Sequence, residues 1–254
     1  MQQPPTPAPP VSEARVEIVQ RIADIPADAW NACAFPDPQR LNPFVGHAFL
    51  RALEEAGCVG GRSGWSPRHL VLRKSNAAGQ DPADSILACA PAYLKSHSQG
   101  EYVFDHSWAD AYARAGGDYY PKLQVAVPFT PVPGPRLLVR PGPECIANEA
   151  LLAQALMQVV EQADLSGAHV TFLTEEQWQR LGMQGFLQRT DQQFHWTNAG
   201  YATFDDFLAS LASRKRKAVR KEREEALKAA GLTVSWLRGR EITEADWDAF
   251  FAFY

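Results

Sequence analysis

Residues 93–122 read YLKSHSQGEYVFDHSWADAYARAGGDYYPK, and they mix aromatic and ionisable side chains. The stretch holds seven aromatic residues and nine ionisable groups other than tyrosine. Aromatic residues are 11% of the whole chain but nearly a quarter of these positions. Charged groups packed against large apolar rings cost free energy unless each charge is paired. The stretch therefore predicts a pocket walled by aromatic rings and ionic groups.

The composition around this stretch is that of a soluble globular protein with one large or two modest domains. The chain has 254 residues, of which 46% are hydrophobic and 21% charged. Its net charge of −4 is unevenly distributed, because residues 214–228 carry a local charge of +5 and the remainder about −9. A general nucleic-acid binder would be basic throughout, so this class is disfavoured.

The cysteine spacing, the lengths of the apolar runs and the N-terminal composition argue against metal sites, redox sites, membrane spans and a signal peptide. The four cysteines are widely spaced and form no C-x-x-C pair, so we expect neither a zinc or other metal site nor a redox pair. No apolar run approaches the length of a membrane span. The proline-rich residues 1–13 have no apolar core of a signal peptide, and we expect a disordered tail. These features together predict a cytoplasmic protein.

The hydrophobic pattern predicts alternating strands and helices, which indicates an α/β or layered α+β fold. The expected strands are residues 15–22, 69–73, 86–95, 125–129, 170–173 and 186–197. The expected helices are residues 26–33, 43–56, 104–115, 148–163 and 174–181. Within the helix 104–115, one apolar face is expected to comprise Phe104, Trp108, Ala111, Tyr112 and Ala115.

Capping signals extend this interpretation to the end of the chain. Thr174 with Gln177 predicts a capping box, and Thr203 with Asp206 predicts a second one opening a helix over 204–230. A strand at 232–237 and a helix capped by Thr243 follow. One strand and one helix after that long helix do not close a core. We therefore expect a chain truncated inside a second domain.

The order of the expected strands and helices suggests the GNAT acyltransferase fold. Four sequence motifs also resemble those of a known family. The motifs are HSQGEYVFDHSWADAY at 97–112, YYPKLQVAVPFTPVPGPRLL at 119–138, QFHWTNAGY at 193–201 and FDDFLASLASRKRKAVRKERE at 204–224. Together they resemble the Fem-like (FemAB-type) predicted N-acyltransferases, a peptidoglycan biosynthesis or recognition family, from about Asn42 onward. The resemblance implies a first GNAT-like domain at 14–200 and the incomplete start of a second at 201–254.

The same resemblance implies an N-acyltransferase that moves an acyl or aminoacyl group to an amine. The acceptor would be a small molecule or a lipid-linked cell-wall precursor. The donor would be acyl-CoA or aminoacyl-tRNA, and no bound cofactor is expected. The alternative is a non-catalytic recognition module that binds an anionic cell-wall precursor or RNA. Prolines at a turn expected to bind the donor favour this alternative.

Three side chains in the 93–122 stretch are candidates for accepting the proton of the attacking amine. Glu101 and Asp105 stand among aromatic rings, where burial raises the pKa of a carboxyl group. Alternatively, Asp105 caps the following helix and Glu101 pairs with Lys95 or Lys122. His97 follows a strand and is either a base or a structural hydrogen-bonding residue.

Further candidates would bind substrate or donor. The substrate-binding candidates are Lys95, Trp108, Tyr119, Tyr120, Lys122 and Arg136. At the position where GNAT proteins have a glycine-rich donor turn, residues 130–136 read TPVPGPR. The three prolines remove N–H donors and leave Thr130, Val132, Gly134 and Arg136. Thr130 and Gly134 would contact the donor, and Arg136 would bind a phosphate or carboxylate or form a surface salt bridge.

The basic segment predicts contact with a polyanion. Its candidate residues are Arg214, Lys215, Arg216, Lys217, Arg220 and Lys221. A helical projection places Arg214, Lys217 and Lys221 on one side and the arginines 216, 220 and 223 on another. The partner would be tRNA, a lipid-linked pyrophosphate or an anionic membrane surface. The alternative is a face that is merely solvated.

Overall fold

A computed structural model of the chain describes residues 14–39, 41–75, 85–229 and 233–253. The chain divides into two compact units between Arg189 and Thr190, whereas the sequence analysis expects the boundary after residue 200. The tail expected at 1–13 and the first residue of the strand expected at 232–237 lie outside the described residues. Each unit is described by itself.

The first unit contains two four-stranded sheets. One has the order β1-β3-β4-β7, and all its neighbouring strands are antiparallel. The other has the order β2-β5-β6-β8, in which β6 and β8 are parallel. The strands are β1 (Ala14–Val19), β2 (Trp65–Pro67), β3 (His69–Lys74), β4 (Ile86–Ala90), β5 (Ala92–Lys95), β6 (Lys122–Val125), β7 (Leu138–Val139) and β8 (Ala168–Val170).

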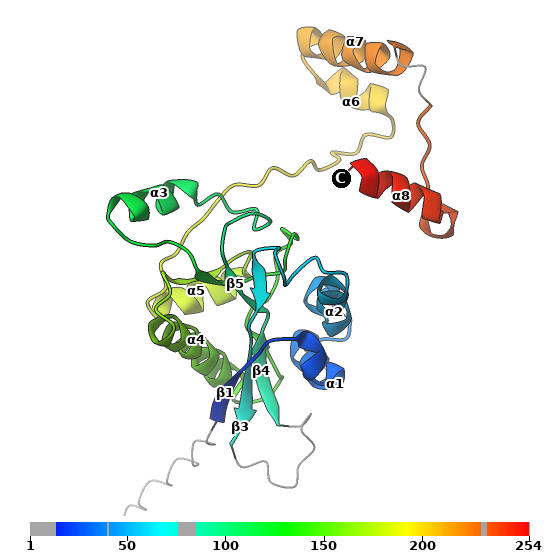
Figure 1. The fold of residues 1–254 in the computed structure, drawn as a ribbon. Coiled ribbons are helices and arrows are strands. Elements are labelled where there is room, and N and C mark those ends of the chain that lie inside the picture. The colour runs from blue at the N-terminus through cyan, green and yellow to red at the C-terminus, as the bar shows by residue number, and fades with distance from the viewer. Residues whose placement is uncertain (1–13, 40, 76–84, 230–232, 254) are drawn as a thin grey trace, which may run out of the picture. The chain divides into compact units, whose positions relative to one another are not determined.

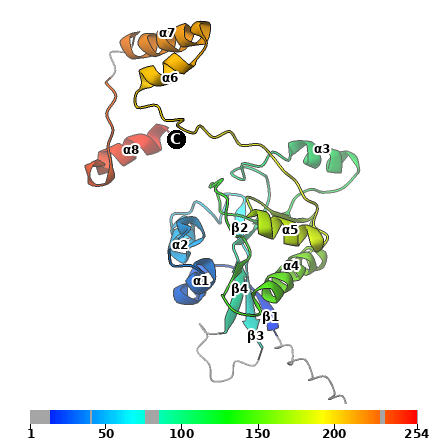
Figure 2. The same cartoon turned by 180° about the vertical axis from the view of Figure 1, so that it is seen from behind.

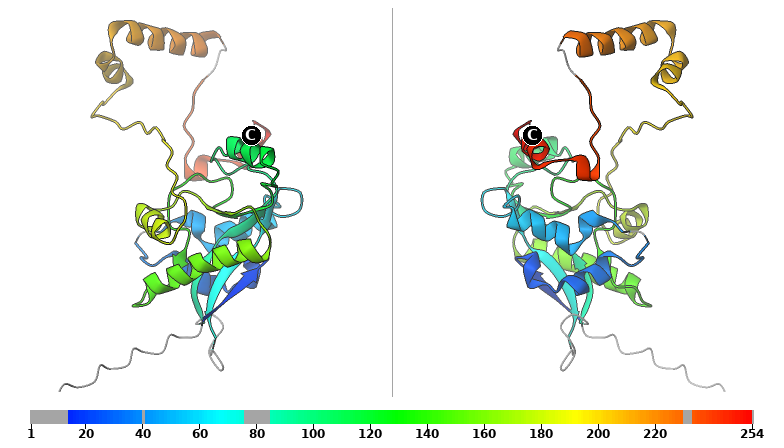
Figure 3. Two further views of the ribbon diagram at one scale, coloured as in Figure 1. Left: turned by 90° about the vertical axis from the view of Figure 1, so that its left-hand side faces the viewer. Right: turned by 90° about the vertical axis from the view of Figure 1, so that its right-hand side faces the viewer.

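Helices cover both faces of the first sheet. Figures 1 and 2 show α1 and α2 on one side of β3 and β4, and α4 and α5 on the other. Figure 3 shows α4 in front of the strands in its left panel, and α1 and α2 in front of them in its right panel. The helices are α1 (Ala27–Ala34), α2 (His47–Glu55), α3 (His106–Arg114), α4 (Cys145–Gln162) and α5 (Glu175–Met183), with 3₁₀ turns η1 (Ile22–Asp24) and η2 (Pro43–Val45).

The alternation of side chains along the strands builds a core on each face of this sheet. Successive strand residues point to opposite faces, so Val71 packs with Trp30 of α1 while Leu70 and Leu72 pack with Leu152 of α4. Residues 69–72 are all buried because both faces are covered. The layered α+β fold expected from the sequence is confirmed at this level.

Several expected strands differ from the structure. Those expected at 125–129 and 170–173 meet β6 and β8 only at their first residue, because each observed strand ends there. The strand expected at 86–95 is two strands, because Pro91 separates β4 in the first sheet from β5 in the second. Proline offers no N–H for the ladder, which explains the break. The strand expected at 186–197 is wrong, since these residues form no strand. Phe194 and Trp196 are exposed there, so burial does not hold the segment in a sheet.

The second unit is helical in its described residues. It contains α6 (Phe204–Ser210), α7 (Ser213–Ala229), η3 (Gly239–Glu241) and α8 (Glu244–Phe253). Leu211, with an extended backbone, ends α6 and splits the single helix expected at 204–230. The described residues 233–237 form no strand. No described helix of the chain is both long and apolar enough to cross a bilayer.

The helix caps at Thr203 and Thr174 are confirmed, but Gln177 differs from its expected role. Thr203 and Asp206 form the reciprocal capping box, and Thr174 accepts from the backbone N–H of Gln177. The Gln177 side chain is buried and bonds to other elements instead. Its Nε2 donates to the Leu137 carbonyl at 2.7 Å, and its Oε1 accepts from the Arg136 N–H at 2.8 Å.

Replacing Gln177 with alanine should therefore cost far more than the loss of a helix cap. The change leaves the Arg136 N–H and the Leu137 carbonyl buried without these partners. We expect the free energy of unfolding to fall by about 2–4 kcal/mol in chemical denaturation. Gln179→Ala, on the same helix and bonded to Glu175 at the surface, is the control and should change it by less than about 0.5 kcal/mol. Equal effects of the two variants would contradict this role.

Candidate functional site

The loop between β5 and α3 is held to the second sheet by a buried ammonium group. Lys122, the first residue of β6, lies directly opposite Lys95 of β5, and both side chains are fully buried. The Nζ of Lys122 donates to Ser98 Oγ at 2.9 Å, Glu101 Oε2 at 2.8 Å and Asp105 Oδ2 at 2.5 Å. Three loop residues thus share one cation.

Aromatic rings enclose this cation, as the composition of the stretch predicts. Tyr119 donates its hydroxyl to Asp105 Oδ2 at 2.8 Å, and the Tyr120 hydroxyl lies 2.8 Å from Ser98 Oγ. The ring centroids of Tyr119 and Tyr120 are 5.3 and 5.8 Å from the Nζ of Lys122. The hydroxyls bind the same loop residues as the ammonium group. The tyrosines are therefore part of one closed network.

Lys95 occupies a separate subsite formed by Trp65. Its Nζ lies 3.7 Å from the centroid of the Trp65 ring and donates to the Gln99 carbonyl at 3.2 Å. Glu101 Oε1 is 3.9 Å away. Burial lowers the pKa of Lys95 to about 8, although the nearby Glu101 opposes the shift. Lys95 is therefore held less tightly in its charged form than an exposed lysine.

The two carboxyl groups differ in how they respond to burial. Burial tends to raise the pKa of Asp105, but hydrogen bonds from Lys122, Ser98 and Tyr119 outweigh it and lower the pKa to about 2. Burial raises the pKa of Glu101 against the opposing effect of Lys122. Their side chains are 3% and 1% exposed. Asp105 also stands in the N-cap position of α3, but its side chain makes no capping hydrogen bond.

Glu101 forms the ion pair with Lys122 that the sequence analysis gives as its alternative role, and Asp105 joins the same cation without capping α3. Lys95 Nζ lies 3.9 Å from Glu101 Oε1, so two ammonium groups offset the two carboxylates. In the part of the chain that the structure describes, Glu101 Oε1 and Asp105 Oδ1 accept no hydrogen bond. The Glu101 and Asp105 carboxylates therefore position the loop, and in this arrangement they do not face an incoming amine.

His97 is the one part-exposed residue of the three catalytic candidates. Its Nδ1 accepts from the Gln99 N–H at 3.3 Å. Its Nε2 lies against Gly64, which has a φ of +74°, and a Cβ at Gly64 would collide with the ring. Burial and the neighbouring Lys95 lower the pKa of His97, so the imidazole is uncharged at neutral pH. It remains the candidate best suited to accept a proton.

The turn expected to bind the donor is filled by bonds within the chain. Its four N–H groups donate to internal acceptors, which leaves none for a phosphate in this arrangement. The bonds are from Thr130 to the Val127 carbonyl at 3.3 Å, from Val132 to the Thr130 carbonyl at 2.9 Å, from Gly134 to the Phe172 carbonyl at 2.9 Å, and from Arg136 to Gln177 Oε1 at 2.8 Å. The structure thus argues against Thr130 and Gly134 as donor contacts.

Arg136 is also a correction to the sequence analysis. Its side chain is fully buried, not exposed to a ligand. The guanidinium donates to the carbonyls of Val132, Gly134 and Pro135 at 2.6, 3.2 and 3.2 Å. Burial lowers the pKa of Arg136 to about 10. Three hydrogen bonds close its own turn, whereas Nε has no partner among the described residues.

Trp108 lies outside the cluster, on α3. None of the side chains of α3 is buried, and Trp108 is 52% exposed. The apolar face expected for this helix therefore does not join the core. Tyr112 alone links it to the cluster, through a ring contact of 6.0 Å with Tyr119. The helix is held mainly at its start, where Asp105 binds Lys122.

Several members of the cluster were not identified from the sequence. Trp65 and His169 come from distant segments, and no local motif marks them. His169 Nε2 lies 3.5 Å from the Tyr119 hydroxyl, and burial followed by repulsion from Lys122 lowers its pKa to about 4. Ser98 was within the quoted stretch, but only the structure shows it between Lys122 and Tyr120. No group of His, Cys, Asp and Glu suited to a metal ion occurs among the described residues.

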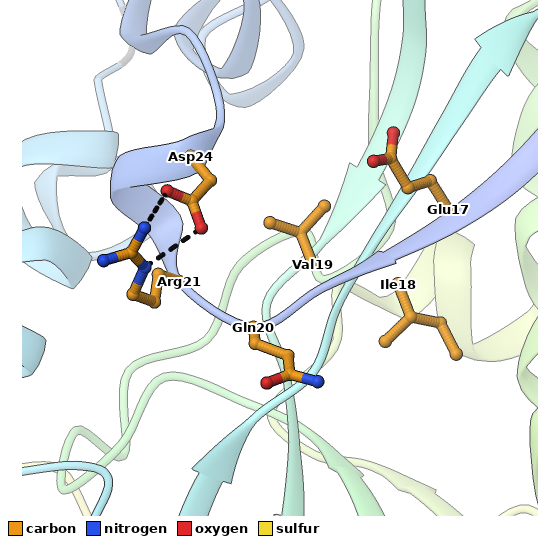
Figure 4. Close-up of a pocket in the computed structure, with 6 residues that line it drawn as sticks. All are labelled: Glu17, Ile18, Val19, Gln20, Arg21 and Asp24. Atoms are coloured by element: carbon orange, nitrogen blue, oxygen red, sulfur yellow. Dashed lines mark hydrogen bonds and ion pairs between the residues drawn. The ribbon is translucent and has the colours of Figure 1, made fainter.

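A surface hollow elsewhere in the first unit offers no alternative site. It has a volume of about 370 Å³ and lies beside the end of β1, as Figure 4 shows. Arg21 and Asp24, its facing charges, are bonded to each other at 2.6 and 3.0 Å. The residues that line it are Glu17, Ile18, Val19, Gln20, Arg21 and Asp24. It shares no residue with the Lys122 cluster.

Comparison with known proteins identifies one relationship. A family model named FemAB-like and described as peptidoglycan biosynthesis/recognition matches residues 21–254. Comparisons with curated proteins and with solved structures give no match. The match spans both compact units, so it includes the Lys122 cluster and the basic helix α7.

The two buried lysines should respond differently to the same substitution. Lys122→Met leaves Glu101 and Asp105 buried without their cation, and we expect the free energy of unfolding to fall by about 3–5 kcal/mol. Lys95→Met removes an ammonium group that burial already disfavours, and we expect a loss below about 1.5 kcal/mol or a gain. Chemical denaturation of both variants measures the difference. A larger loss of unfolding free energy for Lys95→Met than for Lys122→Met would contradict the conclusion that Lys122 holds the cluster together.

Acid should weaken the cluster through Asp105. A carboxyl whose pKa falls from 3.8 to about 2 on folding stabilises the fold above pH 3.8, and that stabilisation disappears as the pH falls through 2. It amounts to about 2 kcal/mol. We therefore expect the stability gap between wild type and Asp105→Asn to shrink between these pH values. Denaturation curves across this range test it, and a constant gap would exclude the coupling. Both proteins retain Glu101, whose raised pKa acts in the opposite direction.

Proposed function

Because the chain belongs to the FemAB-like family of peptidoglycan biosynthesis and recognition, we propose that it transfers an acyl or aminoacyl group to an amine of a peptidoglycan precursor. The observation that carries the proposal is the family match over residues 21–254. The fold supports it through the parallel pair β6 and β8, between which α4 forms the crossover. This arrangement suits a GNAT-like layered domain.

The reaction requires a neutral amine that attacks the carbonyl of a thioester or ester. A new C–N bond forms, the C–S or C–O bond of the donor breaks, and the amine loses a proton. His97 is the candidate acceptor, because its imidazole is part-exposed and uncharged at neutral pH. The lone pair on Nδ1, which now faces the Gln99 N–H, would take the proton.

The Lys122 cluster supports this chemistry by positioning the loop. Ser98 and Glu101 bind the ammonium on either side of Gln99, so the loop is fixed directly after His97, and β5 ends at Lys95 just before it. The Gln99 carbonyl also accepts from Lys95 and from the Trp65 indole at 3.2 Å each. Catalytic groups need such support to remain in productive geometry. Glu101 and Asp105 would thus act as positioning residues.

The donor remains either acyl-CoA or aminoacyl-tRNA. Both carry phosphates, and the 130–136 turn offers them no free backbone N–H in this arrangement. The donor phosphates would therefore bind another surface.

Turnover with the purified chain tests the proposal. A panel of acyl-CoA and aminoacyl-tRNA donors is supplied with a peptidoglycan precursor that carries a free amine, and product is detected by mass. We expect one donor class to be consumed, and His97→Gln to lower kcat/KM by about 100-fold or more. His106→Gln, which changes an exposed histidine on α3, should leave kcat/KM unchanged. Equal activity of both variants would exclude His97 as the base.

A recognition protein without transfer activity is the second candidate, and the occupied amides of the 130–136 turn favour it. The two candidates differ in their response to CoA. A rise in melting temperature that grows with CoA concentration supports transfer from acyl-CoA. Stabilisation by the precursor alone, with no donor of either class consumed, supports recognition and contradicts the transferase proposal.

A further inference from the structure

Six cations of α7 form two groups on sides of the helix that are about 120° apart. Three arginines contact α6, so they contribute to the folding of the second unit. They are Arg216 with the Ala209 carbonyl at 3.4 Å, Arg220 with Asp205 at 3.7 Å, and Arg223 over the ring of Phe204 at 4.2 Å. The six-residue patch expected from the sequence is therefore not a single surface. Two of its six residues, Arg216 and Arg220, contact α6.

The second group is a stripe of exposed cations. Arg214, Lys217 and Lys221 follow one another at spacings of three and four residues. At about 100° per residue they fall within an arc of roughly 60°, centred about 120° from the arginines that contact α6. Arg214 and Lys217 have no ion pair or hydrogen bond with any described residue. Lys221 approaches Glu225 at 3.6 Å but stays 75% exposed.

Helix stability does not explain this stripe. The first turn of α7 contains cations and no acid, whereas the helix macrodipole favours the reverse. The acids Glu222, Glu224 and Glu225 lie farther along the helix, where they neutralise its second half. The concentration of positive charge in the first half therefore costs stability locally. An anionic partner would offset that cost.

We propose that the stripe of Arg214, Lys217 and Lys221 docks residues 190–254 on an anionic lipid surface. The stripe is about 10 Å long and one-sided, and the arginines about 120° around the helix are engaged with α6. Such a layout fits a flat array of phosphates better than a polymer that wraps the helix. The stripe has no large apolar side chain, so binding is electrostatic and without insertion.

The docking inference is independent of the proposed transfer reaction, because vesicle binding is measured without donor or acceptor. The full chain is sedimented with vesicles of phosphatidylcholine alone or of equal parts phosphatidylcholine and phosphatidylglycerol. We expect binding to the anionic vesicles only, weakening as salt is added. Each cation at an anionic surface strengthens binding about fivefold, so the triple variant Arg214→Glu/Lys217→Glu/Lys221→Glu should bind roughly a hundredfold more weakly.

A matched control variant distinguishes binding by the stripe from an effect of the protein's net charge. Arg62→Glu/Lys74→Glu/Arg240→Glu makes the same change in net charge at exposed positions outside α7 and should bind anionic vesicles nearly as well as wild type. Glutamate in the first turn favours a helix, so circular dichroism should show α7 retained in the α7 triple variant.

Three outcomes would overturn the proposal. The first is no binding of the wild type to anionic vesicles. The second is equal loss of binding in both triple variants. The third is salt-sensitive binding to tRNA that depends on the stripe while vesicle binding is absent, which would assign α7 to RNA.

Discussion

The ammonium group of Lys122 is the interaction on which the middle of the first unit depends. It joins Ser98, Glu101 and Asp105 to the start of β6. The side chains of α3 remain outside the core, so apolar packing of that helix does not hold the loop in place. Lys95 lies opposite Lys122 on the neighbouring strand. Cross-strand partners share a face of the sheet, so two lysines there require the nearby carboxylates. The aromatic rings exclude water and strengthen those pairs.

The polar groups of the 130–136 turn also bond within the protein. Arg136 and Gln177 close it from inside, with bonds to carbonyls and to backbone N–H groups that would otherwise be free. A polar group buried here must find a partner within the protein, and each partner it finds is lost to a ligand. The family match and the occupied turn are compatible if the donor is bound elsewhere.

Local signals predicted the elements whose causes are local. The strand over residues 69–73, the helix over residues 26–33 and the cap at Thr203 arise from neighbours within a few residues, and the structure has them as β3, α1 and the capping box of α6. Residues 186–197 have a pattern typical of a strand but form none. A strand is stable only when another strand pairs with it, and no local pattern reports whether that partner exists. The strand expected at 86–95 is split at Pro91, because proline has no N–H for the ladder. The hydrophobic pattern alone gives no sign of this break.

The sequence by itself predicted that buried charge within residues 93–122 would lie among aromatic rings, because a buried charge needs a partner, although four of the seven rings are exposed in the structure. It did not determine whether those charges would face a ligand or one another. That choice depends on strand register, which sets Lys95 against Lys122, and on the loop that carries Glu101 and Asp105 back to them. Only the tertiary structure brings these groups within hydrogen-bonding distance. Contact between residues far apart in the chain is decided by packing of whole elements, and not by any property of the segments alone.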